Sequence, residues 1–325
     1  MNTTPPKRSR WLHRYAVFVA CMTFLLLIAG ALVTSNDAGL SVPDWPTSFG
    51  SFRIPRMVGG VKFEDGHRMI AGFVAILTVI LALALWAKED RRWLRWLGGF
   101  AVLAVIIQAV LGGLGVIFYL PLTLTVSHSC MAEIFFATMV SLAIFTSPKW
   151  RWEEAKASDP STPSLRHAAV AVNVIILVQI LLGAAYRNEV QDLFAGEHLR
   201  HGVGVLPHIV FAGVVLAAVL YLLVRTLRLK TRNLRLLYPV FALVTLVVIQ
   251  IFLGVGAYTM MLLARAAPQP VTPVVLATVM HVAVGALVFV TSIVVTYQTY
   301  RFVAPPATRL SLPSEETVTA GNPLP

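Results

Sequence analysis

Residues 64–86 read EDGHRMIAGFVAILTVILALALW, a short charged segment with a histidine followed by a long apolar run. A run of about 18 or more such residues is long enough to cross the ~30 Å hydrocarbon layer as one α-helix. His67 lies where this helix enters the membrane. Three further histidines, His128, His208 and His281, lie near the starts of later apolar runs. The pattern predicts membrane helices that carry histidines at one membrane surface.

The composition of the whole chain supports a membrane protein. Of its 325 residues, 57% are hydrophobic and only 13% are charged, and the mean hydropathy is +0.77. These values are typical of polytopic membrane proteins and exclude an ordinary soluble domain. We expect eight membrane helices, over residues 15–35, 67–87, 96–118, 123–146, 167–186, 203–224, 236–262 and 273–298. The predicted fold class is therefore an all-α membrane protein with eight transmembrane helices.

The net charge of +11 follows the membrane topology rather than a nucleic-acid surface. With the N-terminus inside, 19 of the 26 Lys and Arg residues fall on the cytoplasmic side of the predicted helices. This asymmetry is the positive-inside pattern. We expect a multi-pass protein of the cell (inner) membrane, in contact with membrane lipids and not with nucleic acid, whose two termini are cytoplasmic.

The two halves of the chain repeat each other. Gln108 and Gln250 lie 142 residues apart, and His67 and His208 lie 141 residues apart. Each half has four helices, so both halves enter the membrane from the same side, and the repeat is parallel. We predict two pseudo-symmetric four-helix bundles, 15–146 and 167–300. The other parts are a cytoplasmic N-terminus (1–14), a cytoplasmic linker (147–166) and a disordered cytoplasmic tail (301–325).

A second pattern recurs on the third, fifth and seventh helices. A glutamine is followed four residues later by a glycine, in the pairs Gln108 and Gly112, Gln179 and Gly183, and Gln250 and Gly254. Small residues let membrane helices approach closely, or leave room for a flat ligand. We interpret these glycines as packing positions in preference to direct ligand contacts.

Histidine is a common axial ligand of haem iron, and two histidines on opposite faces of the porphyrin complete its coordination. Each half supplies one pair, His67 with His128 and His208 with His281. All four lie toward the extracytoplasmic side in the predicted topology. A single histidine at a helix end is more often an interfacial anchor, but four at matching places favour ligands. We interpret His198 and His201, in the loop before the sixth helix, as solvated.

Glu64 distinguishes the two halves. It precedes His67 by three residues and shares a face with it on a helix, whereas the matching residue before His208 is Val205. The first half therefore has a histidine pair with a carboxylate, and we predict that it carries the chemistry. The second half is predicted to hold a haem for electron transfer or for structure. Glu133, five residues after His128, is a further carboxylate within a span, with a helix contact or a proton path as its possible roles.

Five segments together resemble the haem A synthase family, whose mitochondrial members assist cytochrome oxidase assembly. They are TSNDAGLSVPDWP at 34–46, EDGHR at 64–68, SHSCMAE at 127–133, LPH at 206–208 and MHVAVGAL at 280–287. The resemblance implies a membrane enzyme that oxidises the C8 methyl group of haem O to a formyl group by successive hydroxylations. It further implies that His208 and His281 ligate haem b. By the same resemblance, His67 and His128 receive the substrate haem O, with Glu64 at the catalytic centre.

The resemblance also implies haem O synthase, cytochrome oxidase subunits and an electron donor as partners. Some family members carry a cysteine pair in the first outer loop, which this chain lacks. Two other functions fit the histidines alone. A membrane cytochrome b type electron carrier would hold two permanent bis-histidine haems, and a haem carrier would move haem without changing it.

Overall fold

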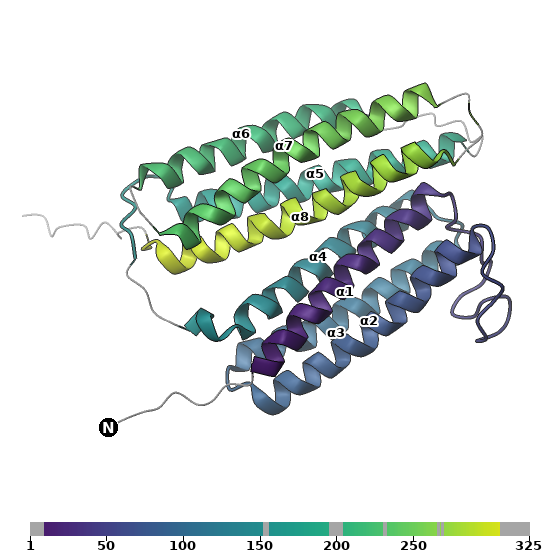
Figure 1. Cartoon of the computed structure of the whole chain (residues 1–325), viewed down its shortest axis with the longest axis horizontal. Helices are drawn as coiled ribbons and strands as arrows, with labels where there is room; N and C mark the ends of the chain where they lie inside the picture. The colour runs from purple at the N-terminus through teal and green to yellow at the C-terminus, as the bar shows by residue number, and fades with distance from the viewer. Residues whose placement is uncertain are drawn as a thin grey trace, which may run out of the picture.

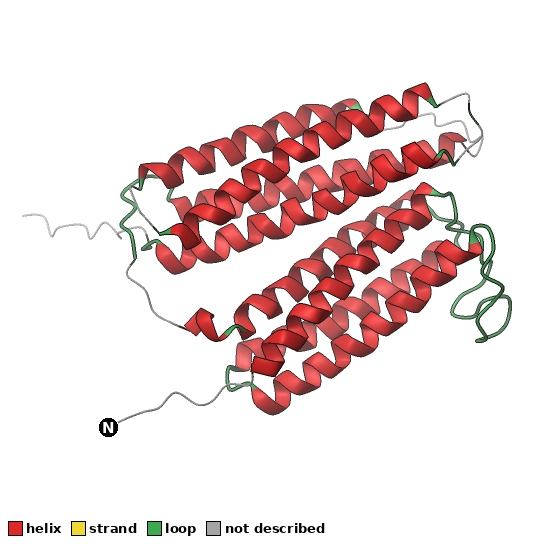
Figure 2. Cartoon of the chain, viewed as in Figure 1, coloured by secondary structure: helices red, strands yellow, loops and turns green. Residues whose placement is uncertain are grey.

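In a computed structural model of the chain, the described residues are 10–151, 156–194, 204–229, 233–264, 267 and 270–305. The regular elements of this part of the chain are all helical (Figures 1 and 2). In chain order they are α1 (Arg10–Ser35), α2 (Val61–Lys88), α3 (Arg92–Ile117), α4 (Leu122–Thr146), the 3-10 turn η1 (Pro148–Arg151), α5 (Leu165–Phe194), α6 (Leu206–Arg228), α7 (Leu234–Leu263) and α8 (Thr272–Phe302). Each of the eight α-helices contains a window long and apolar enough to cross a membrane. The predicted all-α fold with eight spans is confirmed.

The helix boundaries differ from the prediction by a few residues at several helix ends. α2 begins at Val61, six residues before the predicted start, so Glu64 belongs to its first turn. α6 begins at Leu206, three residues later than predicted, with Val205 as its N-cap residue. α8 continues to Phe302, so the predicted tail from residue 301 does not begin there. Residues 1–9 and 306–325, with most of the predicted tail, lie outside the described residues.

The eight helices pack as two sets of four (Figure 1). Within the first set, α1 contacts α2 and α4, and α3 contacts α2 and α4; α5 to α8 contact one another in the same cyclic order. The two sets meet through α1 and α4 on one side and α5 and α8 on the other. Both sets show the neighbour pattern that an internal repeat requires, while pseudo-symmetry itself stays a prediction.

Because lipid tails are as apolar as leucine, such helices associate through close packing and hydrogen bonds rather than through a hydrophobic driving force. Each set has its own buried cluster, centred on side chains such as Leu81 and Met139 in the first and Leu222 and Leu243 in the second. We call the end of the sets that holds residues 36–60 the loop end, and the end that holds residues 147–164 the linker end. Both are visible in Figure 2.

The linker is anchored to the second set. Asp159 accepts hydrogen bonds from the backbone N–H of Leu165 (2.5 Å) and the Ser161 hydroxyl, and lies 3.4 Å from Nη2 of Arg225. Burial opposes the charge of Asp159, but the bonds from Ser161 and Leu165, with the Arg225 guanidinium nearby, hold the pKa of its carboxyl below the usual aspartate range. This carboxylate fixes the chain where it enters α5.

Candidate functional site

The four histidines singled out from the sequence all lie at the loop end, in the N-terminal part of the even-numbered helices. His67 is in α2, His128 in α4, His208 in α6 and His281 in α8. These helices run from the loop end to the linker end, so their first turns share one level of the molecule (Figure 1). The structure therefore gathers the predicted ligands at one end.

Each histidine ring lies against a glycine of the preceding helix. A Cβ built on that glycine would approach the histidine Cε1 more closely than the ordinary contact distance of 3.4–4 Å. The distances are 3.1 Å for Gly30 and His67, 3.0 Å for Gly112 and His128, 2.7 Å for Gly183 and His208, and 2.9 Å for Gly254 and His281. A Cβ at any of these positions would force the histidine ring to shift. These positions are packing positions, as predicted, with the candidate ligand as their neighbour.

Gly30 was missed from the sequence because the residue four positions before it is Leu26, and the glutamine that marks the other three glycines is absent. At those three sites the glutamine amide touches the histidine ring. The amide nitrogen lies 3.2 Å from His128 Nε2 for Gln108, 3.1 Å from His208 Nδ1 for Gln179, and 3.2 Å from His281 Nε2 for Gln250. The Nδ1 of His128 also contacts the backbone carbonyl of Gln108 at 3.1 Å. Such contacts orient a ring that binds a metal.

The pair in the second set has a geometry that fits one metal between two imidazoles. The ring centroids of His208 and His281 lie 6.2 Å apart. Imidazole nitrogens bind metals at about 2 Å, so rings on opposite sides of one metal have centroids about this far apart. The described residues hold no group of three or more His, Cys, Asp or Glu side chains placed to bind a metal ion. Two imidazoles suit haem, because the porphyrin supplies the other four nitrogens of its iron.

Several buried polar atoms of these glutamines and histidines have no partner within the described part of the chain. The side-chain Oε1 atoms of Gln108, Gln179 and Gln250, and Nδ1 of His281, are buried and have no hydrogen-bond partner among the described residues. Unpaired buried polar groups are costly. The residues present therefore fit a haem held between His208 and His281.

In the first set, His67 and His128 lie close enough to interact electrostatically. Glu64, only 4% exposed, lies one turn before His67. Its carboxylate accepts a hydrogen bond from Nη2 of Arg68 at 2.6 Å and from the backbone N–H of Val42 at 2.8 Å. Glu64 therefore links the start of α2 to the outer loop and forms a largely buried ion pair beside the first histidine pair.

Arg68 was counted from the sequence only as an outer basic residue, but it holds the outer loop in place. Besides Glu64, it donates hydrogen bonds to the backbone carbonyls of Asp44 (2.8 Å), Thr47 (3.2 Å) and Val42 (3.4 Å). These tertiary contacts cannot be predicted from the local sequence pattern. The loop was expected to be ordered, and these bonds explain how it is held.

Two further loop residues seat the loop over the first set. The Trp45 ring lies against α3 so closely that a Cβ at Gly113 would overlap it. Gly113 follows Gly112, the residue that contacts His128. Asp44 accepts hydrogen bonds from the Thr47 hydroxyl and from the N–H groups of Gly50 (2.8 Å) and Phe49 (2.7 Å). These bonds, together with Arg68, hold the pKa of the Asp44 carboxyl below its usual range. The loop is thus fixed to α3 and to the start of α2, next to residues that contact or precede the first histidine pair.

Arg187 joins the two sets at the loop end and was not singled out from the sequence as a site residue. Its Nη2 in α5 donates to the carbonyl of Ala31 and to the hydroxyl of Ser35, both in α1 and both at 2.8 Å. The Ser35 hydroxyl in turn contacts that of Thr278, in α8, at 2.9 Å. Arg187 also interacts electrostatically with His281. A partly buried cation thus lies between the halves beside the second pair.

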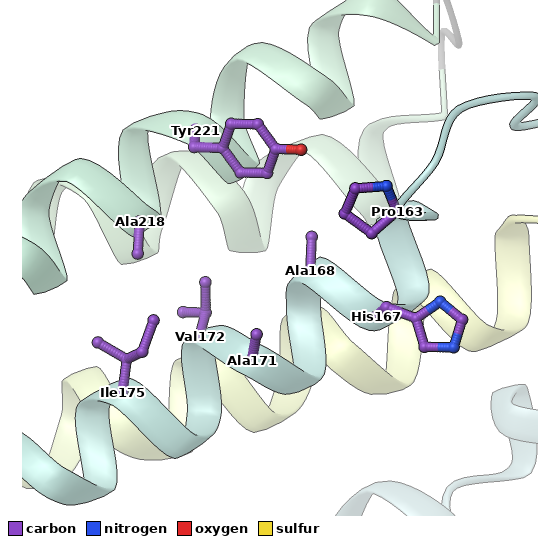
Figure 3. Close-up of a pocket in the computed structure, with 8 residues that line it drawn as sticks. All are labelled: Pro163, His167, Ala168, Ala171, Val172, Ile175, Ala218 and Tyr221. Atoms are coloured by element: carbon purple, nitrogen blue, oxygen red, sulfur yellow. The ribbon is translucent and has the colours of Figure 1, made fainter.

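Other polar residues lie outside these sites. A cavity of about 260 Å³ near the linker end is lined by His167 and Tyr221, with mostly apolar neighbours (Figure 3). It lies at the opposite end of α5 from Gly183 and contains none of the paired histidines. Glu133 is buried in α4, and its Oε2 has no partner among the described residues. His198 and His201 lie outside the described residues.

The fold and the site define a polytopic helical membrane protein with two histidine pairs at one end. Residues 62–199 match the COX15-CtaA family, described as cytochrome oxidase assembly protein. The predicted family resemblance is confirmed.

Several curated relatives are named heme A synthase. The chain is 29% identical to the protein of Lysinibacillus sphaericus over 59% of its length, 31% identical to that of Bacillus pumilus over 44%, and 26% identical to that of Shewanella oneidensis over 53%. These matches cover 62%, 47% and 55% of the respective relatives. The chain thus spans about half the length of the curated relatives it matches.

Proposed function

We propose that this chain is a haem A synthase, which oxidises the C8 methyl group of haem O to a formyl group by successive hydroxylations. One observation carries the proposal: the family match at 62–199 includes Glu64, His67 and His128, the complete first site. The relatives matched in the curated comparison are themselves named heme A synthase.

The second site is proposed to hold haem b, ligated by His208 and His281. When bound, haem b supplies a redox-active iron. The chain supplies the geometry around it, with Gly183 and Gly254 admitting the two rings and the glutamine amides touching them. Val205, at the place that matches Glu64, has no acidic group. This half is therefore proposed to serve electron transfer rather than the oxidation of the methyl group.

The first site is proposed to receive haem O between His67 and His128, with the C8 methyl group near Glu64. Each hydroxylation replaces a C–H bond of the methyl carbon by C–OH, and the carbon gives up two electrons to an oxidant that the chain itself does not supply. A second hydroxylation on the same carbon gives a hydrate that loses water to become the formyl group. Glu64 is the carboxylate beside this pair and is proposed to accept protons, while Arg68 orients it. The outer loop seated by Trp45 limits access of water.

The proposed orientation places the two termini in the cytoplasm and the histidine pairs toward the extracytoplasmic side. It rests on the distribution of Lys and Arg between the two ends. Haem O synthase and cytochrome oxidase subunits are the proposed partners, and an electron donor must complete the reaction.

The deciding experiment is haem extraction from cells that make haem O, with and without this protein, followed by chromatographic separation. A new haem A peak is expected, and haem O that stays unchanged would remove the proposal. A membrane cytochrome b type carrier would instead show two haem b per chain and no haem A. That outcome would favour the alternative function.

A pair of variants tests the role of Glu64. Glu64→Ala is expected to abolish formyl formation while the haem b spectrum of the second site is retained. Asp65→Asn is the matched control, because Asp65 is the neighbouring buried carboxylate and binds the Ser48 hydroxyl at 2.5 Å in the loop. It is expected to keep formyl formation. Haem A production by Glu64→Ala would exclude the proposed role.

A further inference from the structure

One part of the outer loop exposes large apolar side chains. Within residues 49–58, Phe52 is 84% exposed and Ile54 is 68% exposed, and Phe49 and Val58 are each more than half exposed. Exposed apolar side chains on the eight helices face the lipid, but these side chains belong to a loop. A cluster of this kind on a protein surface marks an interaction site. We call residues 49–58 the loop edge.

A contact with α2 fixes the level of the loop edge relative to the membrane. The Cε methyl group of Met57 lies beside Gly66, where an added Cβ would be 3.8 Å from it. Gly66 precedes Met69, the first residue of the apolar run of α2, by three residues. The two residues therefore differ by about 4.5 Å along the helix axis, whereas each headgroup layer is about 5–7 Å thick. Met57 thus lies at the level of the lipid headgroups.

The loop edge lies on the lipid-facing side of the first helix set. α2 packs against α1 and α3, on the side of this set that faces away from α5 to α8 (Figure 1). Figure 2 shows the loop reaching sideways past the start of α2. The chain enters α2 at Val61, three residues after Val58, so Val58 stays within about 10 Å of the start of that helix. The exposed side chains therefore border the bilayer.

The same segment carries exposed cations. Arg53 and Arg56 lie in the loop edge and Lys62 lies in the first turn of α2, and all three are exposed. None of them is paired with an acidic side chain of the described residues. The carboxylate of Glu64 is bound to Arg68, which leaves these three charges uncompensated. The loop edge thus combines apolar side chains with unpaired cations.

We propose that the loop edge is a membrane anchor. Its apolar side chains insert among the lipids of the adjoining leaflet, and its cations bind anionic headgroups. Buried apolar area and attraction to anionic lipids together set the affinity of such interfacial segments. The loop edge lies between Val42, whose N–H binds Glu64, and the start of α2. The anchor therefore holds the outer loop in the position from which it contacts Glu64.

The test places one spin label on the full-length chain. Cys21→Ser and Cys130→Ser remove the two free cysteines, and Phe52→Cys provides the labelling site. The protein is reconstituted in vesicles of phosphatidylcholine alone and of an equal mixture with phosphatidylglycerol. Leu83→Cys, 65% exposed on α2, is the lipid reference, and Asp90→Cys, exposed between α2 and α3, is the aqueous reference.

The measurement compares collisions of the label with oxygen, which is enriched in the bilayer, and with a water-soluble nickel chelate. The label at position 52 is expected to resemble the lipid reference in the mixed vesicles. A label that resembles the aqueous reference in both kinds of vesicle would overturn the proposal and favour a protein partner. Shielding that depends on the ratio of protein to lipid would also overturn it, because a second copy would then cover the loop edge.

Charge variants test the headgroup contact. Arg53→Gln with Arg56→Gln removes two cations, each contributing about 1 kcal/mol near an anionic surface. The ratio of inserted to water-exposed label is therefore expected to fall about 30-fold in the mixed vesicles. Lys88→Gln with Arg92→Gln is the matched control, because it removes two exposed cations at the linker end. It is expected to leave the ratio unchanged, and an equal fall in both double variants would refute a contact located at the loop edge.

Two further measurements complete the test. Ile54→Ser keeps the charge of the loop edge but reduces its apolar area, so it is expected to expose the label to the nickel chelate; unchanged shielding would exclude insertion. In the unlabelled wild type, cleavage by trypsin after Arg53 and Arg56 is expected to be slower in the mixed vesicles than in phosphatidylcholine, and equal rates would contradict the proposal. Thermal unfolding shows whether each variant is folded. These measurements need no haem, so their outcome is independent of the proposed synthase activity.

Discussion

The glycines beneath the histidine rings provide the sharpest test of the second site. In Gly254→Ala, the new Cβ would lie 2.9 Å from Cε1 of His281, whereas ordinary contact begins at 3.4 Å. The ring must retreat by about 0.5 Å, which is the tolerance within which a cofactor site has to be held. Forcing one methyl group into a packed site costs about 1–3 kcal/mol. We therefore expect haem b to bind about 5-fold to 150-fold more weakly.

Gly256→Ala is the matched control, because it lies two residues further along α7 and a Cβ there meets no atom within 4 Å. Both variants gain the same helix propensity, about 1 kcal/mol for alanine over glycine, so their difference isolates the contact with the ring. The assay is the ratio of haem b to protein after purification from membranes, together with the absorption spectrum of the bound haem. If both variants carry haem b in the wild-type ratio, His281 is not an axial ligand at this position.

Three further predictions concern the loop and the contact between the helix sets. Arg68→Gln leaves Glu64 buried without its cation and should lower the free energy of local unfolding of the loop by about 3–5 kcal/mol. The expected result is faster proteolysis near Arg53, and an unchanged rate of cleavage would contradict this. The pKa of Asp44 is held low, so its contribution to loop stability is present above the ordinary value of about 3.9 and is lost as pH falls through the lower folded value. The protection factors of the loop amides, which correct for the slower intrinsic hydrogen exchange at low pH, should therefore fall on acidification in the wild type but change much less in Asp44→Asn. Arg187→Gln should lower the thermal unfolding temperature and shift the midpoint potential of haem b downward, because a cation beside His281 is lost; an unchanged potential would exclude that placement.

The fold was predictable because the bilayer leaves few choices. A segment that crosses it must satisfy its own backbone hydrogen bonds, so length and hydropathy suffice to find eight helices. The start of α2 was the exception. Glu64 and Asp65 look like loop residues by polarity, but both are helical and buried, because the Val42 N–H and the Ser48 hydroxyl satisfy their carboxylates. Those partners lie about 20 residues earlier in the chain, so no local pattern could reveal them.

Part of the candidate site could be predicted from the spacing of residues in the sequence. The histidines and the glutamine-glycine pairs recur at fixed offsets, and the structure explains the recurrence, since each of these glycines admits the ring of a histidine from the following helix. Gly30, Arg68 and Arg187 could not be found in this way. Gly30 lacks the glutamine that marks the other glycines. The two arginines donate hydrogen bonds to backbone carbonyls and hydroxyls of segments that are distant in the sequence. The residues next to each arginine in the sequence therefore do not predict these contacts.

Two differences between the halves favour an exchanging ligand in the first half and a resident cofactor in the second. At His128, His208 and His281 a glutamine amide touches the ring, whereas the corresponding position before Gly30 is Leu26, which has no polar side-chain group to orient His67. The rings of the second set also press more closely on their glycines, at 2.7 and 2.9 Å against 3.1 and 3.0 Å in the first. A resident cofactor gains from ligands that are fixed, but a substrate that is also held through its iron must leave after each turnover. A ring with fewer fixed contacts, placed beside the carboxylate of Glu64, suits a ligand that exchanges. The same half thus combines fewer fixed contacts on His67 with the carboxylate of Glu64 one turn before it, which is the combination that we expect of a substrate site.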